Sequence, residues 1–104
     1  MLNVNGKECW DLNGWFPLHW ACWRGHLDAA KYLLEECGAD ITSQGNFGIT
    51  PLHNACCNGH LAVTKYLVEE RGVAVNMRNI YRETPLDLAR DKNKMDAVNY
   101  LEAH

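Results

Sequence analysis

The clearest hydrophobic pattern in the chain is a stripe at helical spacing within residues 61–70. Its members fall at positions i, i+3, i+6 and i+7, which share one face of an α-helix: Leu61, Thr64, Leu67 and Val68. Lys65 and Glu69 fall on the opposite side. A short amphipathic helix is stable only when its stripe is covered, so the pattern predicts a helix that packs against neighbouring elements.

The same stretch recurs along the chain, and the prolines mark its period. The three prolines, Pro17, Pro51 and Pro85, follow one another at intervals of 34 residues. Residues 17–50 and 51–84 are identical at fifteen of thirty-four positions, where unrelated sequences of ordinary composition would agree at about two or three. A third, less regular copy begins at Thr84 and keeps five of the shared residues: Pro85, Leu86, Ala89, Tyr100 and Leu101. The sequence therefore predicts an array of similar units.

Each unit is predicted to hold two short antiparallel helices and an extended loop. Thr50 and Thr84 stand directly before a proline, where a hydroxyl can cap the first helix and the proline presets its first residue. Gly25 and Gly59 are predicted to end that helix, since glycine takes the left-handed conformation readily. One helix pair cannot bury its own stripe, so the copies are expected to stack as a solenoid.

Two segments carry a resemblance to a known family: FPLHWACWRGHLDAAKYLLEECGAD and TPLHNACCNGHLAVTKYLVEERG. They resemble ankyrin repeats, whose pattern runs through T-P-L-H, A-A, G-H-L, a leucine-rich second helix and G-A-D. The resemblance covers roughly residues 11–104 and implies an all-α ankyrin-repeat solenoid of antiparallel helix pairs joined by β-turn finger loops. It implies about three repeats in a single domain of residues 1–104: an N-terminal segment and first finger (1–16), repeat 1 (17–50), repeat 2 (51–83) and a C-terminal capping repeat (84–104).

The chain departs from the family pattern in ways that predict local changes. Arg82 replaces the turn glycine of the last finger, and a side chain in the left-handed region costs on the order of 1 kcal/mol, so a distorted finger is expected. Each full copy also has one residue more than the usual period, near residues 35–36 and 69–70. The extra residue is expected to lengthen the second helix or to bulge its end.

Composition and charge exclude several classes of protein. The chain is 47% hydrophobic and 22% charged over 104 residues, and its net charge of -3 gives no reason to expect a nucleic-acid ligand. No run of about 18 apolar residues predicts a membrane span. The five cysteines are an odd number without C-x-x-C pairs, which disfavours a disulfide framework. A reducing compartment, the cytoplasm or the nucleus, is therefore expected.

Histidines and cysteines recur together and could suggest a nucleophile or a zinc site: His19, Cys22 and His26, then His53, Cys56 and His60. A thiolate nucleophile also needs an oxyanion hole and a cleft, and four zinc ligands would have to come from two separate repeats. The resemblance implies that the histidines form hydrogen bonds between loops and helix ends. No catalytic, metal-binding or cofactor-binding residue is therefore predicted. Cys57 is expected to be an exposed thiol, and Tyr32, Tyr66 and Tyr100 are expected to be packed scaffold residues.

The candidate partner-binding residues lie at positions that do not repeat. The resemblance makes the finger tips and the last residues of each first helix the variable positions. Here they are rich in aromatic and aliphatic side chains, whereas an ordinary solvated surface carries mostly charged and polar ones. Tryptophan and tyrosine are among the residues that most often anchor protein interfaces. The predicted set is Leu12, Trp15, Trp23, Arg24, Asn46, Phe47, Ile49, Cys57, Asn58, Ile80 and Tyr81. Four rings, Trp15, Trp23, Phe47 and Tyr81, are expected to contribute most of the binding energy.

The function implied is a non-catalytic protein-binding module that presents a rigid concave and finger surface. We expect a protein partner, no nucleic acid, no membrane, no cofactor, and a monomer rather than a homodimer. One alternative is a structural or self-associating piece of a longer ankyrin array, joined through its N-terminal face. A second alternative is a Cys/His-dependent enzyme or a zinc-binding protein.

Overall fold

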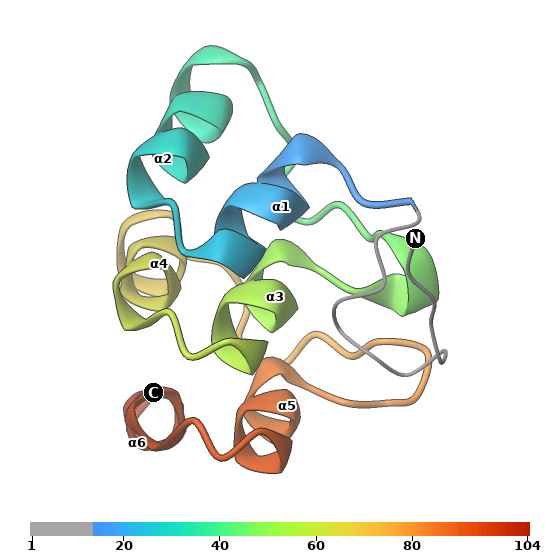
Figure 1. Ribbon diagram of the computed structural model, residues 1–104, viewed down its shortest axis with the longest axis vertical. Helices are drawn as coiled ribbons and strands as arrows, with labels where there is room; N and C mark the ends of the chain where they lie inside the picture. Colours follow the sequence, from blue (N-terminus) through green and yellow to red (C-terminus); the bar gives the residue numbers. More distant parts are fainter. Residues whose placement is uncertain (1–13) are drawn as a thin grey trace.

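The computed structural model describes residues 14–104 and arranges them as three stacked helix pairs (Figure 1). The elements, in chain order, are α1 (Pro17–Arg24), α2 (Leu27–Glu36), the 3-10 turn η1 (Asn46–Gly48), α3 (Pro51–Cys57), α4 (Leu61–Lys65), the π-helical turn η2 (Tyr66–Glu70), α5 (Pro85–Asp91) and α6 (Met95–Glu102). Figure 1 shows α1, α3 and α5 as one row and α2, α4 and α6 as a second. The described residues contain no strand, and the all-α prediction is confirmed.

The first helix of each pair begins as the sequence predicts. Thr50 Oγ1 accepts a hydrogen bond from the backbone N–H of His53 at 3.3 Å, and Thr84 Oγ1 accepts one from Asp87 at 3.2 Å. Each proline that follows occupies the first helical turn. At α1 the capping residue is Phe16, which has no hydroxyl, and only the return bond remains, from the Phe16 N–H to His19 Nδ1 at 3.1 Å.

The link between the paired helices depends on one left-handed residue. Gly25 has φ 73°, and the next residue, His26, donates its N–H back to the carbonyl of Ala21 at 2.9 Å. This pattern closes the end of α1 and lets α2 begin at Leu27. His60 makes the same return bond to Ala55, also at 2.9 Å. The predicted position of the turn is confirmed.

The extra residue in each full copy has the effect expected of it. α2 continues for ten residues, and the second helix of repeat 2 ends in the π-helical turn of residues 66–70. There the N–H of Arg71 bonds the carbonyl of Tyr66, five residues earlier, at 3.2 Å. A π-helical turn is how a helix absorbs one inserted residue without ending.

The core lies between the two rows of helices. Leu18, Leu52 and Leu67 are almost fully buried, and Ala55 and Ala89 are small enough to let adjacent helices approach closely. The predicted stripe is only partly correct, because Leu61 and Val68 are half-buried while Val63 and Tyr66 are buried. The buried face is wider than the sequence pattern because α4 is covered by α2 on one side and by α6 on the other.

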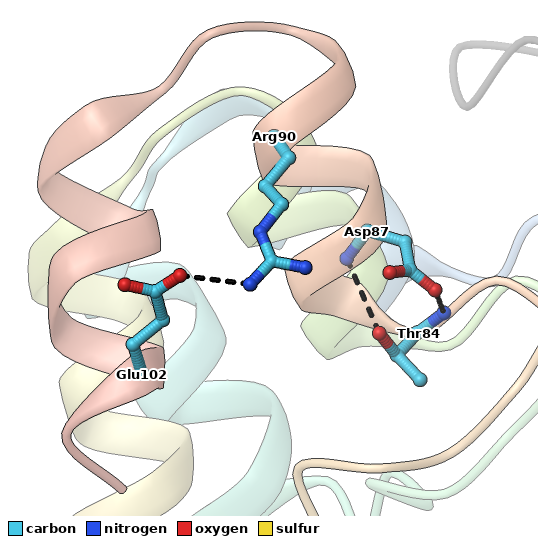
Figure 2. Close-up of polar contacts among 4 residues, drawn as sticks. All are labelled: Thr84, Asp87, Arg90 and Glu102. Atoms are coloured by element: carbon cyan, nitrogen blue, oxygen red, sulfur yellow. Dashed lines mark hydrogen bonds and ion pairs between the residues drawn. The ribbon is translucent and has the colours of Figure 1, made fainter.

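The last helix pair presents polar side chains where the earlier pairs bury apolar ones. Arg90 occupies the position of the buried Cys56 in the repeat, and it forms an ion pair with Glu102 at 2.8 Å between exposed side chains (Figure 2). Asp87 takes the place of His53, and its carboxylate accepts the Thr84 N–H at 3.0 Å. The surface at this end of the stack is therefore charged and exposed to solvent.

Candidate functional site

The finger between α2 and α3 is a tight turn closed by its own backbone. The N–H of Gly45 donates to the carbonyl of Ile49 at 2.8 Å, and the N–H of Gly48 donates to the carbonyl of Gly45 at 3.0 Å. Phe47 lies at the tip with φ 62°, in the left-handed region that disfavours residues with a β-carbon. Such strain costs on the order of 1 kcal/mol and is found most often at binding and active sites.

The next finger, residues 79–83, is closed by the corresponding backbone hydrogen bond despite its altered sequence. The backbone N–H of Asn79 donates to the carbonyl of Glu83 at 3.0 Å. The side-chain oxygen of Asn79 accepts the N–H groups of Tyr81 and Glu83, both at 2.9 Å. Arg82 adopts φ 65°. The expectation of a distorted finger is therefore wrong, because the Asn79 side chain fixes the turn and holds Arg82 in the left-handed conformation.

The two fingers are joined to each other at their tips. The N–H of Ile80 donates to the carbonyl of Phe47 at 2.9 Å, and the rings of Phe47 and Tyr81 stack with centroids 6.1 Å apart. The side chain of Ile80 remains 64% exposed and that of Tyr81 39% exposed. Two large apolar groups are thus displayed on a backbone that is hydrogen-bonded on both sides.

A second group of rings gathers at α1. Trp15 makes edge contacts with Trp20 and Trp23 at centroid distances of 5.3 and 5.7 Å, and the Arg24 guanidinium lies over the Trp20 ring at 5.5 Å. Trp23 and Phe47 both pack against a buried group formed by Ile49, Cys57 and Leu88. This buried group connects the α1 rings to the fingers. We call the accessible residues of the combined surface the aromatic ledge: Trp20, Trp23, Arg24, Phe47, Ile80 and Tyr81.

Some residues predicted to bind a partner prove to be structural. Ile49 is 3% exposed and Cys57 1% exposed, so neither offers a side chain to a partner. Both are buried because the finger folds back over the end of α3, where Trp23 and Phe47 cover them. Asn58 is half-buried, and its amide donates to the carbonyl of Trp23 at 2.7 Å. Its role is to join adjacent helix ends.

The remaining predicted residues are placed as follows. Asn46 is half-buried in the turn that carries Phe47, and Trp15 is half-buried in edge contact with Trp20 and Trp23. Leu12 lies outside the described residues. Two exposed rings were not predicted, Phe16 at 52% and Tyr32 at 59%. For Tyr32 the sequence did contain a signal, since Tyr66 and Tyr100 each pack against the copy before them, whereas Tyr32 belongs to the first copy of the described array.

Cys57 also differs from its predicted chemistry. It was expected to carry a free, exposed thiol, but it is buried and disulfide-bonded. The expectation of unpaired cysteines therefore fails at this position. Cys22, Cys37 and Cys56 are free cysteines.

Two buried histidines act as struts between each repeat and the next finger. Nε2 of His19 bonds the carbonyl of Ile49, and Nε2 of His53 bonds the carbonyl of Glu83, both at 2.8 Å. On the other side of each ring, Nδ1 accepts a backbone N–H, from Phe16 at 3.1 Å and from Thr50 at 3.2 Å. Because Nδ1 is an acceptor, Nε2 must carry the proton, and the ring must be neutral. Each imidazole therefore fixes a helix start and a finger together.

The cysteines paired with these histidines have no nucleophilic character. Burial raises the pKa of Cys22 and of Cys56 to about 12, so both remain protonated thiols. Cys56 Sγ lies 3.6 Å from Thr64 Oγ1, within the core. Across residues 14–104, no three His, Cys, Asp or Glu side chains are grouped as metal ligands would be. The recurring H-x-x-C spacing is accounted for by packing.

Stability should fall as the pH is lowered through the histidine range. Burial lowers the pKa of His19 and of His53 below the value of about 6.5 found in an unfolded chain. The unfolded state therefore binds more protons, and the stabilisation that is complete above about pH 6.5 is lost as the pH falls toward the folded-state pKa values. Thermal unfolding at pH 7.5, 6.5 and 5.5 would measure this, with each 1 kcal/mol lowering the melting temperature by about 4–8 °C. The variant His53→Gln should show a shallower decline than the unmodified protein. Equal slopes in the two proteins would contradict the assignment.

Stacked helix pairs with hydrogen-bonded fingers define a helical-repeat solenoid. The family model described as ankyrin repeats in many copies matches residues 3–34 and 18–68, which together span well over half of the chain. The chain belongs to the ankyrin repeat family. Members of this family are in general protein–protein interaction modules and are typically non-catalytic. A search of curated proteins gives no significant match. Among the described residues, no helix has the length and apolarity needed to cross a membrane.

Proposed function

We propose that the chain is a non-catalytic binding module that presents the aromatic ledge to a protein partner. The observation that carries this proposal is the pair of joined fingers, where Ile80 is 64% exposed and Tyr81 39% exposed on a hydrogen-bonded backbone. Monomeric proteins rarely display large apolar side chains on a rigid protrusion unless another molecule covers them. Tryptophan, tyrosine and arginine, which make up most of the ledge, are also the commonest anchors of protein interfaces.

The geometry favours binding because the ledge is ordered before a partner arrives. The bond from Ile80 to Phe47 and the bonds accepted by the Asn79 side chain fix the backbone of both fingers. Fixing a backbone on binding costs conformational entropy, and that cost is small where the free protein already holds the bound shape. The rings of Phe47 and Tyr81 are likewise held by their mutual stacking.

Replacing Ile80 and Tyr81 with alanine should weaken partner binding while leaving the fold intact. Each truncation is expected to cost about 1–3 kcal/mol of binding free energy, because each removes a side chain whose exposed part would be desolvated by the partner. The helical content measured by circular dichroism should not change, since neither side chain belongs to the core clusters. Titration calorimetry with a partner identified by affinity capture would measure the loss of binding free energy for each of the two variants.

Met95→Ala is the matched control for this experiment. Met95 is 53% exposed, between Tyr81 at 39% and Ile80 at 64%, but it lies on α6 and not on a finger. Its loss should leave partner binding unchanged. A partner that is retained by the Ile80→Ala and Tyr81→Ala proteins and lost with Met95→Ala would place the binding surface on the outer helices instead.

A further inference from the structure

Cys57 differs in its covalent state from the other cysteines of the described residues. Cys57 is disulfide-bonded, whereas Cys22, Cys37 and Cys56 are free. The sequence contains five cysteines, and the fifth is Cys9. Within a single chain, Cys9 is therefore the one residue that can complete the bond to Cys57.

Cys57 adjoins the aromatic ledge. It is the last residue of α3 and is buried together with Ile49 and Leu88, and the rings of Trp23 and Phe47 pack against this group. The Cα atoms of two disulfide-bonded cysteines lie only about 4.4–6.8 Å apart. The bond therefore brings a second part of the chain close to two rings of the ledge.

The described residues begin close enough to this group for Cys9 to reach it. A β-carbon built on Gly14 would lie 3.4 Å from Oδ1 of Asn46. Asn46 directly precedes Phe47, which packs against the group that contains Cys57. Cys9 precedes Gly14 by five residues, and five extended residues span about 17 Å. The length of chain between Cys9 and Gly14 is therefore sufficient for the bond.

The sequence next to Cys9 is apolar. Trp10 directly follows it, and Leu12 stands two residues further on. Two or three residues span at most about 11 Å, so a bond at Cys9 keeps both side chains within reach of the ledge. Apolar side chains gain free energy when they cover an apolar surface and both lose contact with water. This composition suits residues 1–13 to cover part of the ledge.

We infer that Cys57 is bonded to Cys9 and that this bond is a redox-sensitive tether, which controls access to the aromatic ledge. In the oxidised state the bond holds residues 1–13 against Trp23 and Phe47, and a partner has to displace them. In the reduced state the segment is released and this part of the ledge is open. The inference rests on the proposed function, because it describes how binding at the same surface is regulated.

The switch is a thiol–disulfide exchange with a dithiol reductant. One thiolate of the reductant attacks the bond between Cys9 and Cys57, forms a mixed disulfide with one protein sulfur and releases the other as a thiolate. The second thiol of the reductant then displaces the first, and the reductant leaves as a cyclic disulfide. Two electrons pass to the protein, and the two protein thiolates take up the two protons that the dithiol loses. Molecular oxygen or a small disulfide oxidant restores the bond.

The tether matters because it makes covering the ledge less costly. A free segment loses conformational entropy each time it settles on a surface, and a bond at Cys9 removes part of that freedom in advance. A segment that covers the ledge about nine-tenths of the time lowers the apparent affinity of a partner about tenfold. Reduction should therefore strengthen partner binding by about that factor.

Thiol titration tests the pairing and needs no partner. The full chain, purified in air and then unfolded, should show three thiols, and after a dithiol reductant it should show all five. Cys9→Ser should show all of its remaining thiols under both conditions, because it leaves Cys57 without its bonded partner. Cys37→Ser is the matched control, since Cys37 is free and exposed, and this variant should keep the bond.

Solvent accessibility in the folded, isotope-labelled chain tests the cover. A neutral gadolinium chelate should enhance the relaxation of the Trp23 indole N–H and the Phe47 amide about twofold more in the reduced protein, because the open fraction rises. Met95, exposed on α6, is the internal reference and should not change. The double variant Trp10→Ala and Leu12→Ala keeps the bond and should behave as the reduced protein in both states.

Several results would overturn the inference. Five thiols in the air-purified chain would mean that the bond does not form, and a dimer that a dithiol separates would place the bond between two copies. Equal relaxation enhancement in both states, with the bond intact, would make it a structural link only. None of these measurements uses a partner, so their failure leaves the Ile80→Ala and Tyr81→Ala experiment unaffected. Normal partner binding by those two variants would refute the ledge and leave the thiol counts unchanged.

Discussion

Replacing His53 with alanine is expected to lower the free energy of unfolding by about 3–4 kcal/mol. The ring is fully buried, and its two nitrogens pair with the N–H of Thr50 and the carbonyl of Glu83. The substitution leaves both backbone groups without their partner and opens a cavity between α3 and the finger at residues 79–83. Equilibrium unfolding in urea, followed by circular dichroism, would measure the loss.

His26→Ala is the matched control. His26 also occupies a repeat position but lies on the surface, where truncation normally changes stability by less than about 0.5 kcal/mol. A loss at His53 no larger than the loss at His26 would show that the imidazole is not the strut between the repeat and the finger. A fall in partner binding without a fall in stability would lead to the same conclusion.

Replacing Gly25 with alanine should cost about 3 kcal/mol of folding free energy, for two separate reasons. The residue has φ 73°, where a β-carbon is strained. A β-carbon built there would also lie 2.5 Å from Nδ1 of His60, whose other nitrogen bonds the carbonyl of Trp23 at 2.8 Å. The imidazole would have to move and lose that bond. The melting temperature should fall accordingly.

Gly38→Ala separates these two reasons. Gly38 has nearly the same φ, 70°, but a β-carbon there would meet nothing within 4 Å. Its alanine variant should therefore lose only the conformational part, about 1 kcal/mol. If both variants lose the same amount, the close approach between Gly25 and His60 contributes nothing to the stability of the stack.

The features that the sequence predicted well are those set by local chemistry. A threonine before a proline caps a helix wherever the pair occurs, and a glycine after the last helical residue ends it, so Thr50, Thr84 and Gly25 could be assigned from the repeat alone. The inserted residue was also predictable as a bulge, because a helix has few ways to absorb it. The family model independently supports the array.

The features that it missed depend on how repeats are placed beside one another. Ile49 and Cys57 fall at variable positions of the pattern, yet the finger covers both, and nothing in their local sequence indicates this. Tyr32 has the same sequence context as Tyr66, and only its place at the end of the stack exposes it. Arg82 was expected to distort its finger, and the sequence did not reveal that the Asn79 side chain would accept the N–H groups of Tyr81 and Glu83 and so fix the turn. The sequence therefore predicted a candidate surface, but it could not separate the exposed members of that surface from the buried residues that support them.

The bonds from His19 and His53 have a consequence for how recognition by this protein can change over time. Both imidazoles donate a hydrogen bond to a main-chain carbonyl oxygen, that of Ile49 or that of Glu83. A main-chain oxygen is present whatever residue occupies the position. Selection, or an engineer building a library, can therefore vary the finger side chains without losing the hydrogen bond that joins the finger to the stack. The attachment of the fingers thus depends on backbone groups, which no substitution removes, so the displayed side chains can change and acquire new specificity.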